Sequence, residues 1–119
     1  MKSIFKLLSS EQWEAAKISG LIPRCSADIK HDCVHVNEFK DLTTVCARFF
    51  EPAEVPIALE FAPDSLDQEI EWSDPTKDKP WREGRIKVDF LHADIVLNIY
   101  SFEHEQTDNG IVYRLLGEE

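Results

Sequence analysis

A short apolar run with one histidine at its centre, followed at once by a periodic amphipathic segment, constrains the fold of this chain most strongly. The run covers residues 32–37 and contains His35, and apolar residues then recur three and four apart from Phe39 to Phe50. That period predicts a helix with one buried face, and Asn37 is a residue type that often caps a helix N-terminus. The sequence therefore predicts a strand, a turn and a helix in close succession, and functional side chains often lie at such junctions.

The start of the chain predicts a second strand and helix. Residues 4–8 are apolar except for Lys6, which indicates an inner strand with one polar position. Ser9 and Gln12 have the spacing of a capping box, so a helix should begin there and end near Gly20. The polar segment that follows, residues 24–32, should be irregular.

Alternating apolar residues predict most of the remaining chain to be strands. The expected strands are residues 55–61, 70–72, 86–90, 95–102 and 111–115, with a hairpin turn at 107–110. The predicted order is a strand, a helix, a second strand, a second helix and then several strands. This order indicates an α+β fold of bent, mostly antiparallel sheets, in a single domain over residues 1–119.

The composition excludes several classes of protein. With 119 residues, 43% hydrophobic and 30% charged, the chain has ordinary globular composition. Its net charge of -10 argues against a DNA duplex as the main partner, because that surface is itself anionic. No apolar run approaches the roughly 20 residues of a membrane helix, and Lys6 interrupts the short N-terminal run, so we expect neither a membrane partner nor a secretion signal. Three cysteines without framework spacing then favour free thiols and a cytoplasmic location.

His35 is the first candidate for a functional side chain, because a histidine inside an apolar strand needs hydrogen-bonding partners. It is either a structural histidine or a ligand-binding histidine at the edge of a pocket. On a regular strand His31, Cys33 and His35 would share one face, and Cys25 offers a fourth ligand for zinc. Such neighbours lie about 6–7 Å apart, however, and no paired-ligand motif accompanies them, so we expect no metal.

A second candidate region is residues 79–85, where Trp81 stands beside Arg82 and Gly84 permits a turn. A tryptophan and an arginine can stack on a flat ring and hold a phosphate or carboxylate. The alternative is a solvated loop in which Trp81 covers the edge of the core. No glycine-rich phosphate loop is present in the sequence.

Several segments, taken in order, resemble the DUF952 family of small proteins of unknown function. Residues 4–8 and 11–16 resemble the family's opening I-Y-K/H-I strand and E-W-E-A helix. The segments at residues 33–37, 47–50, 57–61 and 70–72 resemble its F-I-H-L-S, A-x-R-F-F/Y, L-L-x-V-D and L-x-W-E motifs. The similarity covers most of residues 3–102.

This resemblance implies an ADP-ribosyltransferase-like fold, in which a bent two-part sheet holds NAD as a substrate in a central cleft. It implies ligand-binding roles for Lys6 and His35, and we expect Asn37, Trp81 and Arg82 to line the same cleft. The family's F-P-H-L-Y-G segment corresponds here to residues 79–84, which keep the proline and glycine but lack the histidine and tyrosine. The sequence also lacks a clear counterpart of the transferase glutamate. The alternative function is therefore a non-catalytic module that binds a protein partner.

Overall fold

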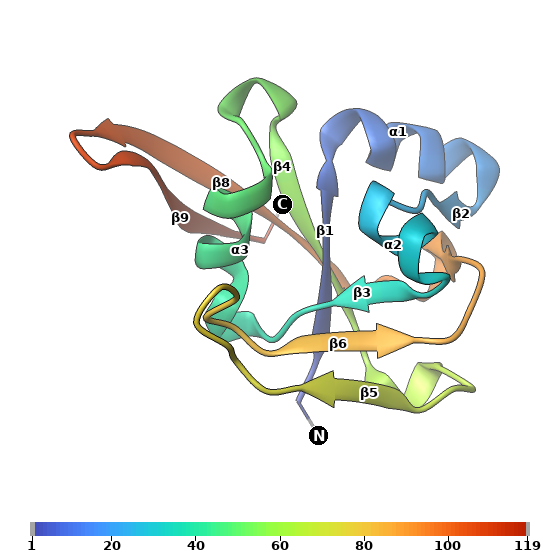
Figure 1. Cartoon of the computed structure of the whole chain (residues 1–119). Helices are drawn as coiled ribbons and strands as arrows, with labels where there is room; N and C mark the ends of the chain where they lie inside the picture. Colours follow the sequence, from blue (N-terminus) through green and yellow to red (C-terminus); the bar gives the residue numbers. More distant parts are fainter. Residues whose placement is uncertain (1, 119) are drawn as a thin grey trace.

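The computed structural model, which describes residues 2–118, places strand β1 (Ile4–Ser9) at the junction of two larger sheets (Figure 1). One sheet has the strand order β1-β4-β8-β9 and the other β3-β6-β5, while β2 and β7 form a small third sheet. The other strands are β2 (Leu21–Ile22), β3 (Val34–Val36), β4 (Pro56–Phe61), β5 (Ile70–Ser73), β6 (Glu83–Ile86), β7 (Leu91–His92), β8 (Asn98–Thr107) and β9 (Gly110–Glu118). The α-helices are α1 (Ser10–Ser19), α2 (Ser26–His31) and α3 (Leu42–Phe49), and short 3₁₀ turns cover Phe39–Asp41, Pro52–Glu54, Pro63–Ser65 and Ala93–Ile95.

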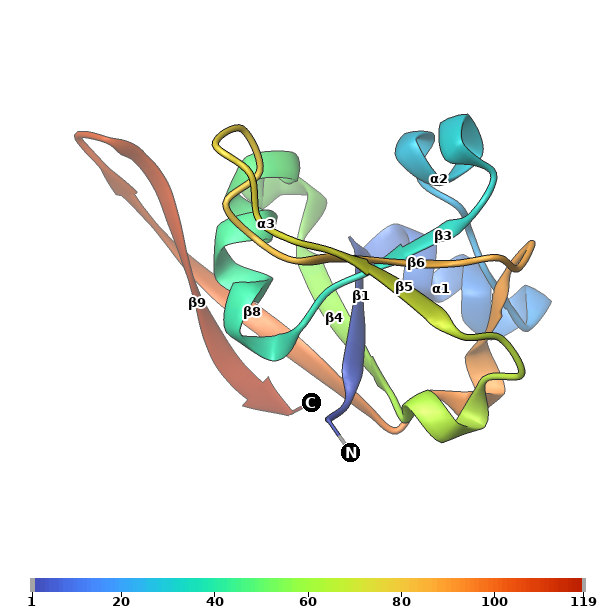
Figure 2. The same ribbon diagram turned by 60° about the horizontal axis from the view of Figure 1, so that its bottom comes forward.

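The two larger sheets meet at a backbone bridge between Phe5 and Asn37. Each residue's N–H donates to the other's carbonyl oxygen, at 2.9 Å and 2.8 Å. Figure 2 shows the β3-β6-β5 sheet crossing β1, while the β8–β9 hairpin extends away from the body. Every strand pair in the described residues is antiparallel, so the predicted α+β class with bent antiparallel sheets is confirmed.

Strand β1 is a nearly continuous run of apolar residues because both of its faces are buried. Ile4 and Leu8 pack into one core cluster, and Phe5 and Leu7 into another. Lys6 is the polar exception and is also buried, at 4% exposure. A buried ammonium group needs a compensating charge, so β1 requires an acidic partner inside the fold.

Helix α1 begins and ends as the sequence predicts. The hydroxyl of Ser9 accepts from the N–H of Gln12, whose side chain in turn accepts from the N–H of Ser9. Gly20 ends the helix in the left-handed region, at φ 82.

Among the described residues, no helix is long and apolar enough to cross a membrane.

We expected residues 24–32 to be irregular, and this prediction is wrong. The segment contains a helix, α2, in addition to the two helices that the sequence predicts. Its first turn is held by Asp28, whose carboxylate accepts from the N–H of Cys25. Asp32 ends it with a left-handed backbone, at φ 52. Cysteine is not among the usual capping residues, so the ordinary start signal is missing from this sequence.

Asn37 is not the helix cap that the sequence suggests. Its backbone is held extended by the bridge to Phe5, and a 3₁₀ turn separates it from α3. Helix α3 keeps the predicted buried face, with Leu42, Val45 and Cys46 inside, but leaves Phe49 59% exposed. The long-range bridge thus overrides the local preference of asparagine for a cap.

Two strand predictions are displaced along the chain. The strand expected at residues 86–90 is β6, which ends at Ile86, and the one expected at 95–102 is β8, which begins at Asn98. The hairpin turn before Gly110 is confirmed, since β8 and β9 pair directly through Thr107 and Gly110.

Candidate functional site

A buried carboxylate, that of Asp28 on α2, organises the residues around His35. Asp28 is 0% exposed and accepts four hydrogen bonds, which fill its capacity. Its Oδ2 accepts from Lys6 Nζ at 2.7 Å and from the N–H of Cys25 at 3.1 Å. Its Oδ1 accepts from the backbone N–H of His35 at 2.9 Å and from ring Nδ1 at 2.7 Å. Asp28 is therefore the acidic partner that the buried Lys6 requires.

The charge of Asp28 is held in place by its donors. Burial alone would raise the pKa of this carboxyl, but the hydrogen bond from His35 and the ammonium group of Lys6 hold the pKa well below its usual range. Lys6 also donates to the backbone carbonyl of His35 at 3.0 Å, so β1, α2 and β3 are joined through these three residues.

The ring of His35 has a fixed orientation because its Nδ1 is engaged by Asp28. Its other nitrogen, Nε2, faces three further groups: His31 Nδ1 at 3.2 Å, Glu83 Oε1 at 3.6 Å and Cys33 Sγ at 3.9 Å. The side chain of His35 is 11% exposed, so the ring is held largely within the protein with an edge open to solvent.

The alternation of β3 and β6 explains which side chains meet at this nitrogen. Val34 and Val36 point into the core, so His35 between them points to the other face. Arg85 lies opposite His35 in the β3–β6 register, and Glu83, two residues earlier on β6, shares that face. The pKa of His31 is lowered by its partial desolvation and by the positive charge of Arg85.

Two of the five predicted site residues, Lys6 and His35, come together directly. Asn37 lies next on the chain but contributes its backbone to the bridge with Phe5. Trp81 is 3% exposed and packs edge-on against Phe49, so it belongs to the core.

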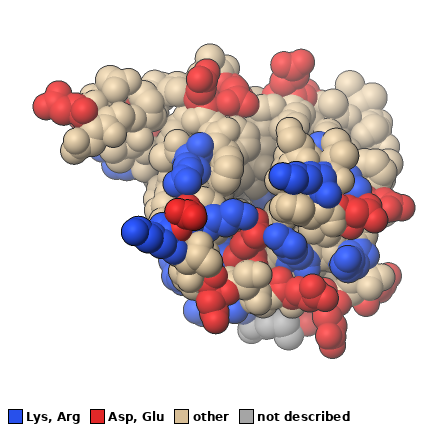
Figure 3. Space-filling model, viewed as in Figure 1, with Lys and Arg blue, Asp and Glu red and all other residues tan. Residues whose placement is uncertain are grey.

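Arg82 lies at the surface beside the core. Its guanidinium group lies 4.9 Å from the ring centroid of Trp72 and 3.4 Å from a carboxylate oxygen of Glu38, and its side chain is 35% exposed. Figure 3 shows Lys and Arg side chains gathered over β6 and the loop before it, with Asp and Glu side chains among them. This face can meet an anionic ligand although the whole chain is acidic.

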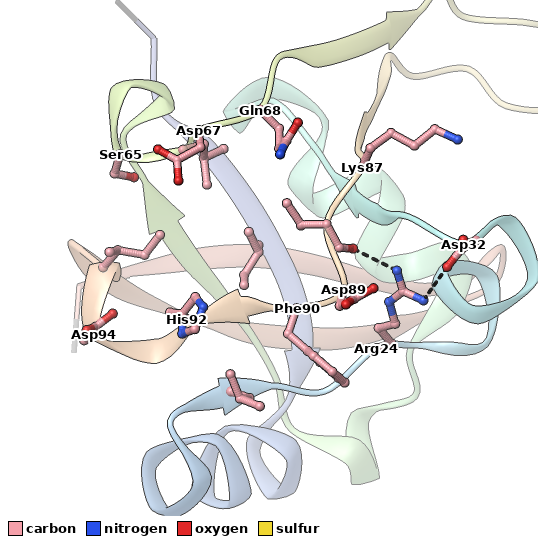
Figure 4. Close-up of a pocket in the computed structure, with 15 residues that line it drawn as sticks. Arg24, Asp32, Ser65, Asp67, Gln68, Lys87, Asp89, Phe90, His92 and Asp94 are labelled. Carbon is pink, nitrogen blue, oxygen red and sulfur yellow. Dashed lines mark hydrogen bonds and ion pairs between the residues drawn. The ribbon is translucent and has the colours of Figure 1, made fainter.

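A broad open pocket of about 870 Å³ lies elsewhere in the molecule (Figure 4). Its lining includes Arg24, Asp32, Lys87, Phe90 and His92, and none of the five predicted site residues. Arg24 is already engaged there, since it donates to Asp32 Oδ1 at 3.1 Å and to the carbonyl of Val88 at 2.8 Å. The sequence predicts Lys6 and Arg82 in one cleft, but neither lines this pocket, and Lys6 is sealed within the core.

Three side chains have potential metal-ligating atoms within 4.8 Å of one another, those of Cys25, Asp28 and His35. All four acceptor positions of Asp28 are already used, and one donor is the ammonium group of Lys6. A cation at this point would have to displace those bonds and face that positive charge, so the trio is better suited to orienting His35 than to holding a metal.

Comparison with known proteins agrees with this fold. The model of the family described as "Protein of unknown function (DUF952)" matches residues 7–93, more than half of the chain. The chain belongs to the DUF952 family. The crystal structure of protein CC0527 from Caulobacter crescentus is similar, with 18% sequence identity over 92% of each chain and a TM-score of 0.72.

The solution NMR structure of CC0527 gives 19% identity over 93% of this chain and 91% of that one, with a TM-score of 0.68. These likenesses show that this DUF952 chain shares its fold with CC0527. The search of curated proteins found no match.

The sequence pattern missed the residues that surround His35 in this DUF952 chain. Asp28 lies 7 residues before His35, and Glu83 lies on β6, far along the chain. Both reach His35 through tertiary structure. One signal could have found Asp28: a lysine in an otherwise apolar inner strand demands a buried acidic partner.

Proposed function

We propose that the chain binds NAD or a related nucleotide on the face of β3 and β6 around His35. One observation carries this proposal: Asp28 engages Nδ1 of the His35 ring, so that Nε2 is directed away from Asp28 toward His31 and Glu83, in a side chain that is 11% exposed. A ring nitrogen fixed in this way can accept a hydrogen bond from a ribose hydroxyl group without first losing rotational freedom.

Positive charge for a phosphate group is available at this face from Arg85 and Lys79, and next to it from Arg82, whose guanidinium group lies over Trp72. The side chains of Arg82 and Arg85 are 35% and 37% exposed, and Lys79 is 44% exposed. Their present partners are carboxylates at 3.4 Å or more, which are loose ion pairs that a bidentate phosphate can replace. The ADP-ribosyltransferase-like character of the fold belongs to this proposal and is supported by the two antiparallel sheets that meet at an angle on β1.

Calorimetric titration of NAD, ADP-ribose and a 2′-phosphorylated RNA end, with a chelator present, tests the proposal. We expect binding of at least one ligand, weakened by about 1–3 kcal/mol in His35→Ala, the cost of one lost hydrogen bond to a charged or buried group. His104→Ala is the matched control, because His104 is exposed on the β8–β9 hairpin. Arg82→Gln removes a guanidinium group that is 35% exposed and reports on the phosphate contact.

No heat with any of the three ligands at millimolar concentration would refute nucleotide binding. Equal weakening in His35→Ala and His104→Ala would place the ligand elsewhere. A protein partner in place of a nucleotide stays a prediction from the sequence.

A further inference from the structure

We propose that the open pocket of about 870 Å³ binds a linear aliphatic polyamine, a chain of methylene groups with amino groups at both ends. The inference is independent of the proposed nucleotide, because neither His35 nor the basic residues around it line this pocket. A concave site of this size is ordinary for a small ligand, since such pockets span about 300–1,000 Å³.

Apolar side chains line much of the pocket. Leu91 is 2% exposed and belongs to a core cluster, and Leu66, Val88 and Ile95 pack against that cluster. Phe90, in the same lining, is 42% exposed. These side chains offer the methylene groups of a ligand an apolar surface to cover, and the ring of Phe90 can also attract a nearby cation.

The charges that are free to meet a ligand in this pocket are mostly negative. Arg24 is already paired, since its guanidinium group donates to Asp32 at 3.1 Å and its side chain is only 15% exposed. Asp67, Asp89 and Asp94 also line the pocket, and within residues 2–118 no group forms a hydrogen bond or ion pair with their carboxylates. Anionic ligands would therefore be repelled by this lining, and cations attracted.

The three unpaired carboxylates are spread along the pocket. Figure 4 shows Asp67 and Asp94 toward one end and Asp89 toward the other, beside Arg24. The side chain of Lys87 extends away from Asp67 and Asp94 in the same view. Negative charge at both ends suits a ligand whose amino groups are separated by methylene groups. It suits a metal ion less well, because the ligands of an ion must converge on one point.

Calorimetric titration with spermidine at physiological salt concentration tests the proposal, with hexaamminecobalt(III) as a compact ion of the same charge. We expect one spermidine per chain, bound more tightly than the compact ion, because only the linear amine can reach both ends of the pocket. Asp67→Asn and Asp89→Asn should each weaken spermidine binding about two- to fivefold, the contribution of one exposed ion pair. Asp108→Asn, in the exposed turn of the β8–β9 hairpin, is the matched control and should leave binding unchanged.

Phe90→Ala separates a fitted ligand from a general attraction of cations to an acidic protein. It leaves every charge in place, so we expect weaker binding of spermidine and unchanged binding of hexaamminecobalt(III). Val112→Ala is its control, because Val112 is 43% exposed on β9 and lies outside the pocket. The proposal is overturned by equal binding of the two cations, by equal effects of Asp67→Asn and Asp108→Asn, or by no heat at millimolar spermidine.

His35→Ala distinguishes this inference from the proposed function, since we expect it to bind spermidine as the unaltered chain does. Loss of spermidine binding in His35→Ala would place the amine at the face of β3 and β6 and contradict a site in the pocket. Asp67→Asn should in turn bind nucleotide normally. Failure of either ligand to bind the unaltered protein therefore refutes one proposal and leaves the other standing.

Discussion

Asp28 Oδ1 lies 2.7 Å from Nδ1 of His35, and the other oxygen of the same carboxylate lies 2.7 Å from Nζ of Lys6. One buried negative charge thus joins a histidine and a lysine that are 29 residues apart in the chain. The carboxylate of Asp28 thus stabilises the junction of β1, α2 and β3, and it also fixes the orientation of the His35 ring at the candidate site.

Asp28→Asn should strongly destabilise the protein. The amide cannot accept from all four donors and leaves Lys6 without a compensating charge, and breaking a buried pair in this way costs about 3–5 kcal/mol. Urea unfolding measures the change, with Asp64→Asn, an exposed aspartate, as the matched control. A loss below about 1 kcal/mol would show that the network contributes little to folding.

Stability should fall in acid because of the same carboxyl. Its pKa is held well below the unfolded value of about 3.9, so its contribution is complete above that value and is lost as the pH falls toward the folded pKa. The pKa of Glu60 is also lowered, because hydrogen bonds from Ser3, Asn98 and Tyr100 outweigh the effect of burial. We expect the free energy of unfolding to decrease from about pH 5 downward, with a shallower slope in Asp28→Asn. A flat profile across this range would contradict the low pKa of Asp28.

Local patterns predicted the elements whose causes are local, and missed those set by tertiary contacts. The Ser9–Gln12 capping box and the β8–β9 hairpin depend on residues close in sequence, and both were correct. Helix α2 depends on Asp28, which Lys6 and His35 hold from other strands, so no ordinary helix signal marks it.

The same dependence on tertiary contacts explains why the sequence predicted only part of the site. An isolated histidine and lysine in apolar strands were visible as anomalies, and they proved to share one partner. For Trp81 the sequence left two alternatives, stacking on a ligand or covering the edge of the core, and the buried ring, covered by Phe49 and Arg48, agrees with the second. A single sequence does not show which side chains from α3 will pack on a distant loop.

Gly84→Ala should destabilise the β3-β6-β5 sheet. The sequence suggested a turn at this glycine, yet it lies inside β6, where a Cβ atom would be 2.8 Å from Val36 Cγ2 and 3.0 Å from both Ile70 Cγ2 and the Trp72 ring. Overpacking of this kind costs about 1–3 kcal/mol. Thermal unfolding measures the loss, and Ser73→Ala on the exposed edge of β5 is the control. Unchanged stability in Gly84→Ala would mean that the three side chains can move apart freely.

The three cysteines should differ sharply in reactivity. Cys25 is exposed, whereas Cys33 and Cys46 are buried, and burial raises the pKa of Cys33 and raises that of Cys46 to about 12. A soluble thiol reagent should label Cys25 alone in the native protein at neutral pH, and all of them after unfolding. Cys25→Ser should abolish the native reaction. Rapid native labelling of Cys33 would show that the buried surroundings of His35 are open to solvent.

The nitrogen resonances of the histidine rings test most directly whether Asp28 presents Nε2 of His35 to a ligand. In the neutral ring we expect the proton of His35 on Nδ1, which donates to Asp28, and none on Nε2. Addition of ADP-ribose to the chelator-treated protein should shift the Nε2 resonance of His35 and leave both resonances of His104 in place. A proton on Nε2, or an Nε2 resonance that stays fixed at millimolar ADP-ribose and NAD, would contradict a ligand-binding role for His35.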